Sequence, residues 1–147
     1  MQGGDPKGDG TGGQSIWGQG FEVESCKELV NITGALAMAR SNSINSNGSQ
    51  FFFDQGGKDN FIGWSQLSSS MNSSKMTNEY KDLYNQNGGN PSLDGYYNKK
   101  GEGYTVFGQI YEGLDVLDQI AKVKVDSNDK PIDNVTINKI TISQYEG

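Results

Sequence analysis

The sequence contains no histidine, one cysteine and one arginine among its 147 residues. Histidine is the commonest general base and metal ligand near neutral pH, so its absence excludes Ser-His-Asp, Cys-His and His-metal chemistry within this chain. The lone cysteine, Cys26, excludes an internal disulfide framework, and its neighbours Ser25 and Lys27 do not mark it as a nucleophile. Three kinds of function remain: carboxylate catalysis, ligand binding, and catalysis that moves no proton.

Positive charge and long apolar runs are also scarce. The formal net charge is −6 and the sequence pI is about 4.5, and no basic stripe interleaved with aromatic residues offsets this acidity. We therefore expect no nucleic-acid partner. No apolar run approaches the roughly 20 residues that a membrane-spanning helix needs, so we expect no membrane span. The compartment stays open: a cytoplasmic location is slightly favoured, and a secreted or surface-anchored one would need a targeting signal before Met1.

The composition predicts one domain that covers residues 1–147, because 33% hydrophobic residues suffice for one core but not comfortably for two. Glycine clusters predict loops between short strands. Strands are expected at residues 21–24, 34–40, 49–54, 104–110 and 135–142. A helix is expected at 113–123, where Leu114, Leu117 and Ile120 share one face. The fold should be mainly β.

A polar insertion at about 55–103 interrupts this pattern. It is rich in Asn and Ser, with scattered aromatic residues, and its segment 77–84 predicts a short helix capped by Thr77. The aromatic and amide content of the insertion leaves a carbohydrate-binding β domain as a minor alternative. No physical argument from the sequence assigns the insertion a role.

The Gly-rich segment at the start matches no ligand-binding loop. QGGDPKGDGTGG lacks the GK[ST] ending of a phosphate-binding loop. Asp5 and Asp9 suggest a calcium loop, but the twelfth position counted from Asp5 is Ile16, where a bidentate Glu belongs. We expect a structural loop here, and no metal or cofactor.

Three segments carry a resemblance to a known family when they are taken together. They read QGGDPKGDGTGGQSIWG near the start, GALAMARSNSINSNGSQFFF in the middle and YTVFGQIYEGLDVLDQI toward the end. In this order and spacing they resemble the cyclophilin family of peptidyl-prolyl cis-trans isomerases, in its bacterial form. The resemblance runs from Gln2 to about Ile142, nearly the whole chain.

The resemblance implies a cyclophilin-like antiparallel eight-stranded barrel with capping helices. It also implies that this chain lacks the N-terminal third of the family, because the segment that begins at Gln2 follows several strands and a first helix in family members. The barrel would then stay open, and unpaired sheet edges and uncovered apolar surface would follow.

The resemblance further implies a groove for proline-containing peptides and unfolded proteins. Its expected substrate-binding residues are Gln2, Gly10, Met38, Ala39, Arg40, Ser41, Gln50, Phe52, Leu93 and Tyr104. Phe52 would floor a proline pocket with Met38 and Leu93 beside it, and Gln2 and Gln50 would contact the peptide. Many members have a tryptophan where this chain has Ser92. Trp64 would reach that place only through a rearranged insertion, so cyclosporin-like ligands are expected to bind poorly.

The activity implied is rotation about X-Pro bonds, the rotamase reaction that assists protein folding. It needs weakened amide resonance and a site that holds the twisted form, with no cofactor. The catalytic arginine of the family lies upstream of Gln2, and Arg40 occupies a peptide-backbone position that is not expected to replace it. We therefore expect weak or no isomerase activity from this chain alone. The alternative is a proline-peptide-binding fragment without turnover.

Overall fold

The computed structural model describes residues 1–61 and 63–144. Its strands are β1 (Gln2–Gly3), β2 (Ala35–Met38), β3 (Phe51–Phe53) and β4 (Val106–Gln109). Its α-helices are α1 (Trp64–Leu67), α2 (Asn78–Asn87) and α3 (Leu114–Ala121). Two short 3-10 helices are η1 (Lys58–Asn60) and η2 (Pro91–Leu93).

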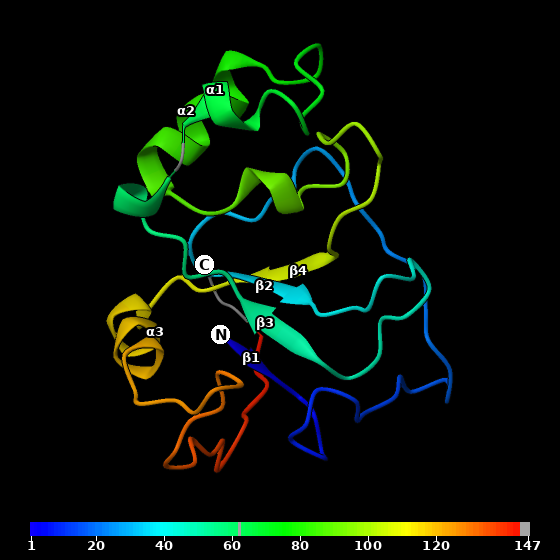
Figure 1. Ribbon diagram of the computed structural model, residues 1–147, viewed down its shortest axis with the longest axis vertical. Coiled ribbons are helices and arrows are strands. Elements are labelled where there is room, and N and C mark those ends of the chain that lie inside the picture. Colours follow the sequence, from blue (N-terminus) through cyan, green and yellow to red (C-terminus); the bar gives the residue numbers. More distant parts are fainter. Residues whose placement is uncertain (62, 145–147) are drawn as a thin grey trace.

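The strands form one antiparallel sheet in the order β1-β3-β2-β4. Phe52 is opposite Gln2 on one side and Ala37 on the other, and an irregularity after Leu36 interrupts the pairing of β2 with β4. Figure 1 shows the sheet between two helical regions, with α1 and α2 beyond one end and α3 beside it. The predicted strands at 34–40, 49–54 and 104–110 are confirmed, each shorter than expected. The described strands make an open four-stranded sheet and not a closed eight-stranded barrel.

Strand alternation gives the two faces of the sheet different roles. Ala35 and Ala37 are fully buried on one face, where they pack with Val106 and with the partly buried Phe52 and Tyr104. Successive side chains of a strand point to opposite faces, so the residues next to these in sequence project to the other side. The small alanines leave room for the aromatic rings above them.

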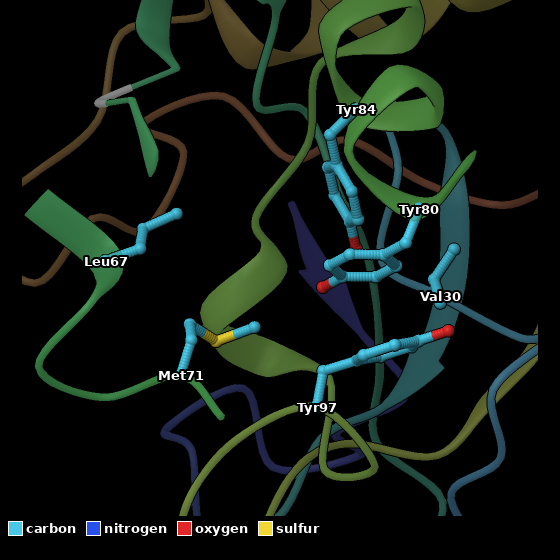
Figure 2. Packing of buried hydrophobic residues seen from close by; sticks show 6 residues of the cluster. All are labelled: Val30, Leu67, Met71, Tyr80, Tyr84 and Tyr97. Carbon is cyan, nitrogen blue, oxygen red and sulfur yellow. The ribbon is translucent and has the colours of Figure 1, made fainter. Parts of the chain in front are cut away.

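A second hydrophobic cluster is built mainly from the insertion, and Val30 joins it from outside. Its buried members are Val30, Leu67, Met71, Tyr80, Tyr84 and Tyr97, shown in Figure 2. The rings of Tyr80 and Tyr97 are stacked, with centroids 3.7 Å apart and planes 20° apart. The predicted helix of the insertion is confirmed as α2, and the Thr77 hydroxyl caps it by accepting a hydrogen bond from the Tyr80 backbone N–H at 3.2 Å.

Asp94 joins this aromatic cluster to the rest of the chain. Its side chain accepts hydrogen bonds from the hydroxyls of Tyr80 at 2.8 Å and Tyr84 at 2.5 Å. It also accepts from the backbone N–H and the Nδ2 of Asn31, both at 2.8 Å. Burial raises the pKa of Asp94, against the opposing effect of these hydrogen bonds. Burial and the nearby Asp94 also raise the pKa values of both tyrosines.

Helix α3 is confirmed where the sequence predicts it, within 113–123. Gly113 stands at its N-cap with φ 87°, Asp115 lies in the first turn, and Leu117 is buried. Of the predicted apolar face, Leu117 anchors the helix, whereas Ile120 is partly buried and Leu114 is 40% exposed. No helix in the described part of the chain is long and apolar enough to cross a membrane.

Two predicted strands are wrong. Within 21–24, Phe21 forms only an isolated bridge with Asn47. Residues 135–142 have no regular structure, and Ile140 and Ile142 are 74% and 93% exposed. A strand is stable only when a neighbouring strand satisfies its backbone, and the described part of the chain offers no such partner to this segment.

Candidate functional site

One groove, with a volume of about 650 Å³, gathers most of the expected site residues. Nine of the ten line it: Gln2, Gly10, Ala39, Arg40, Ser41, Gln50, Phe52, Leu93 and Tyr104. They come from β1 and the loop after it, from the segment that follows β2, from β3 and the residue before it, from η2, and from the segment that leads into β4. Residues that are far apart in sequence therefore converge on one surface.

The floor of the groove is apolar. Phe52 is half-buried on β3, and the ring of Tyr104 meets it edge-on with centroids 5.4 Å apart and planes 89° apart. Leu93, the last residue of η2, also lines the groove. This edge-to-face contact holds both rings in the floor of the groove, where they offer an apolar surface to a small apolar group.

Two glutamine side chains form one wall. The Gln2 Nε2 donates to the Gln50 Oε1 at 2.7 Å, and the Gln50 Nε2 donates to the carbonyl oxygens of Gly12 at 2.8 Å and Gly10 at 3.2 Å. These bonds hold the loop after β1 at the edge of the groove. Within that loop, desolvation raises the pKa of Asp5, but hydrogen bonds from backbone N–H groups outweigh it and keep that pKa low.

Arg40 occupies the side of the groove next to the apolar floor. Its Nε donates to the Gly103 carbonyl oxygen at 2.7 Å, and its Nη1 donates to the Ser41 carbonyl oxygen at 2.9 Å. The guanidinium carbon lies 4.9 Å from the centroid of the Tyr104 ring, a cation-π contact. In the described ranges, no carboxylate lies within 4.0 Å of this guanidinium.

Met38 is placed differently from the expectation, whereas Trp64 stays outside the groove, as expected of an insertion that is not rearranged. Met38 does not line the groove in the described structure, because it follows Ala37 on β2 and so points to the opposite face, opposite Phe51. Trp64 packs against Tyr80 in the insertion, with ring centroids 5.7 Å apart, and is not a groove residue. The insertion does not supply the tryptophan that many cyclophilins have at the groove.

Six lining residues were not expected: Thr11, Gly12, Gly13, Ser46, Gly48 and Ser49. A Cβ on Gly13, whose φ is 90°, would meet the Ser49 Oγ at 2.0 Å. The glycine is therefore needed for two chain segments to approach closely. The paired glycines in the sequence marked a tight loop, but nothing in them indicated which segment would lie against it.

The groove carries amide, hydroxyl and backbone groups but no carboxylate along its described lining. Such a surface can hold a peptide by hydrogen bonds and apolar contact. Nor does the described part of the chain bring three His, Cys, Asp or Glu residues together as a metal site. The geometry thus fits a ligand that is recognised by its shape and by hydrogen bonds.

Comparison with known proteins agrees with this geometry. The family model for the cyclophilin-type peptidyl-prolyl cis-trans isomerases matches residues 1–142. A Staphylococcus saprophyticus protein named as a peptidyl-prolyl cis-trans isomerase is 42% identical over 146 residues, which cover 97% of this chain and 66% of that protein. A bifunctional phosphatase/peptidyl-prolyl cis-trans isomerase of Streptococcus pyogenes is 40% identical over 144 residues, which cover 97% of this chain and 28% of that protein.

Solved structures show the same likeness. A cyclophilin-type peptidyl-prolyl cis-trans isomerase of Cryptosporidium parvum, crystallised in the presence of the dipeptide Ala-Pro, superposes with a TM-score of 0.65 at 29% identity. The match covers 98% of this chain and 68% of that one. The chain thus spans about two thirds of the length of relatives such as the Staphylococcus saprophyticus protein. On the family match, the sequence identity and the shared fold together, the chain belongs to the cyclophilin-type peptidyl-prolyl cis-trans isomerase family.

Proposed function

We propose that this chain isomerises X-Pro bonds in peptides that bind along the groove. The observation that carries the proposal is the apolar floor of Phe52, Tyr104 and Leu93, beside a wall of amide groups. A pyrrolidine ring fits such a floor, and the side-chain amides of Gln2 and Gln50 suit the flanking backbone. The related Cryptosporidium parvum protein was crystallised in the presence of Ala-Pro, which supports the same ligand class.

The chemistry needs little from the protein beyond position and polarity. Amide resonance sets a barrier of roughly 18 to 20 kcal/mol to rotation about a peptide bond. A site lowers it by binding the twisted form more tightly than either planar form. Phe52 would hold the proline ring while the flanking peptide turns, and the polar wall would fix that peptide. No proton has to move, in agreement with a chain that has no histidine.

A second candidate is a proline-peptide-binding module without turnover. The position of Arg40 favours it, because the guanidinium already donates to the carbonyl oxygens of Gly103 and Ser41. A donor held at the side of the groove is poorly placed to follow a rotating prolyl nitrogen. In enzymes, loss of one preorganised hydrogen-bond donor commonly lowers the rate about a hundred- to a thousandfold. A groove without a donor at the prolyl nitrogen would therefore bind the peptide with little turnover.

The test is cis-trans exchange of a short Ala-Pro peptide, measured by NMR, with binding followed in the same samples. The wild-type chain is compared with Phe52→Ala and with Phe107→Ala, a matched control because Phe107 is 52% exposed and does not line the groove. Catalysis that Phe52→Ala abolishes and Phe107→Ala retains supports the isomerase. Near-UV circular dichroism checks that both variants are folded.

A longer version separates the two candidates. It carries the N-terminal third of a relative joined before Met1. If only this longer version catalyses cis-trans exchange, the groove is an isomerase site that needs the rest of the relatives' length. Binding without exchange in either version favours the binding module, and no binding in either version refutes the groove itself.

A further inference from the structure

The groove contains one charged side chain in the described structure, that of Arg40. The other lining residues are glycine, alanine, serine, threonine, glutamine or apolar. This cation stands out further because the whole chain has a net charge of −6. The protein as a whole repels acidic ligands, whereas the groove presents them with a local positive charge.

The guanidinium is held in place and still has donors to spare. Two of its five N–H donors bond to backbone carbonyl oxygens, and its central carbon lies over the ring of Tyr104, 4.9 Å from the ring centroid. The remaining N–H groups have no hydrogen-bond partner in the described ranges. Such a planar fork matches a carboxylate in geometry and charge. Because the side chain is already ordered, binding a carboxylate loses little further rotamer entropy.

The distance from this fork to the apolar floor sets the position of the carboxylate along a peptide. The guanidinium lies 4.9 Å from the Tyr104 ring centroid, and that centroid lies 5.4 Å from the Phe52 ring centroid. The two groups are therefore at most about 10 Å apart, or about three residues of extended chain at roughly 3.3 to 3.6 Å each. A proline on Phe52 would bring the side chain one or two residues away close to Arg40.

We propose that the groove selects peptides with Asp or Glu one or two residues from the proline, through pairing of that carboxylate with Arg40. This rests on the proposed function only in that the groove must bind a proline-containing peptide. Four carboxylates lie within two residues, in sequence, of a groove-lining residue: those of Asp9, Asp54, Asp94 and Glu102. None lies within 4.0 Å of the guanidinium in the described structure, so Arg40 remains available to a ligand.

The test compares peptide pairs that differ by one charge. Alanine-based peptides with one proline carry Glu or Gln at one position, either one or two residues before or after it. Dissociation constants come from NMR titration of the isotope-labelled chain. Wild type should bind the best Glu peptide about three- to fivefold more tightly than its Gln partner, the upper part of the range for a partly exposed ion pair, because Arg40 is already held in place. The ratio should fall toward one in high salt.

Variants assign the preference to one side chain. Arg40→Gln should bind the two peptides of each pair equally, and Arg40→Lys should keep part of the preference because the charge remains. Glu102→Gln, the control for the general field of the protein, should leave the ratio unchanged. Arg40→Gln also loses the bond to Gly103, so the salt dependence of the wild-type ratio provides a test that needs no variant.

The outcomes distinguish the preference for acidic peptides from the proposed binding of proline-containing peptides. Equal binding of Glu and Gln peptides by wild type, with both bound, overturns the acidic preference and leaves the groove intact. A ratio that changes as much in Glu102→Gln as in Arg40→Gln assigns the preference to the overall field and also overturns it. Binding of neither peptide overturns the proposed function itself.

Discussion

Removal of the Asp94 carboxylate should destabilise the protein more than any other single loss of a polar group described above. Asp94→Ala leaves four donors without their acceptor: two tyrosine hydroxyls, and the backbone N–H and Nδ2 of Asn31. Asp94 is 3% exposed, so bulk water does not reach these groups directly.

The magnitude follows from the cost of unsatisfied buried groups. Each costs about 1 to 3 kcal/mol, and the four share one acceptor, so their costs are not additive. Hydroxyl rotation and local relaxation recover part of the loss. We expect Asp94→Ala to lower the free energy of unfolding by about 3 to 5 kcal/mol, a large part of the 5 to 15 kcal/mol typical of a domain. Tyr84→Phe, which removes one donor, should cost about 1 to 2 kcal/mol.

Urea unfolding followed by the fluorescence of Trp64 measures this loss. Trp64 lies beside the cluster, with its ring centroid 5.7 Å from that of Tyr80 and 6.0 Å from that of Tyr84. The chain has two tryptophans, so a Trp17→Phe background isolates the signal. Trp17 is 66% exposed, so we expect the protein to tolerate this change.

The matched control is Asp82→Ala, an exposed aspartate on α2. It should change the free energy of unfolding by less than about 0.5 kcal/mol. The reasoning is refuted if Asp94→Ala costs less than about 1 kcal/mol with an unchanged denaturant dependence. That result would mean that the four donors find other partners and that Asp94 does not hold the insertion in place.

Three further outcomes follow from features of the fold and the groove. Burial raises the pKa of Asp94 in the folded state above 3.8, so the folded state keeps a proton that the unfolded chain releases. As the pH rises from about 4 through the folded-state pKa, the wild type should therefore lose stability relative to Asp94→Asn. Urea unfolding measured at a series of pH values checks this. Gly89→Ala should lower the free energy of unfolding, measured in urea, by about 1 to 3 kcal/mol more than Gly101→Ala. Both glycines have positive φ, but a Cβ at Gly89 would meet backbone atoms at 2.3 and 2.5 Å, whereas a Cβ at Gly101 would meet nothing within 4 Å. Gln50→Glu cannot donate to the two loop carbonyl oxygens and should weaken peptide binding several-fold by NMR titration, whereas Gln119→Glu, on an exposed part of α3, should not.

Local patterns predicted the elements whose stability is mostly local. Helix α3 followed from a 3.6-residue apolar period, and Thr77 was recognised as a cap from its residue type alone. The strands β2, β3 and β4 were found because short apolar runs were bounded by glycine. In each case the deciding information lay within about ten residues.

Long-range pairing could not be predicted in the same way. Residues 135–142 alternate like a strand, but strand formation depends on a neighbour that the segment itself does not specify. Arg40 was recognised as a groove residue, yet its bond to Gly103, which is 63 residues away, has no signature in either segment. The bonds from Asn31 to Asp94, again 63 residues apart, are of the same kind.

The position of η2 gives the protein an intrinsic optical signal. Leu93 lines the groove, and Asp94, the next residue, accepts the hydroxyls of the two tyrosines that pack against Trp64. Because Leu93 and Asp94 are adjacent, we expect a ligand that shifts Leu93 to shift this carboxylate and the rings around the indole as well. We therefore expect occupancy of the groove to change the emission of Trp64 in the Trp17→Phe background, without any attached dye and in the same sample that measures stability.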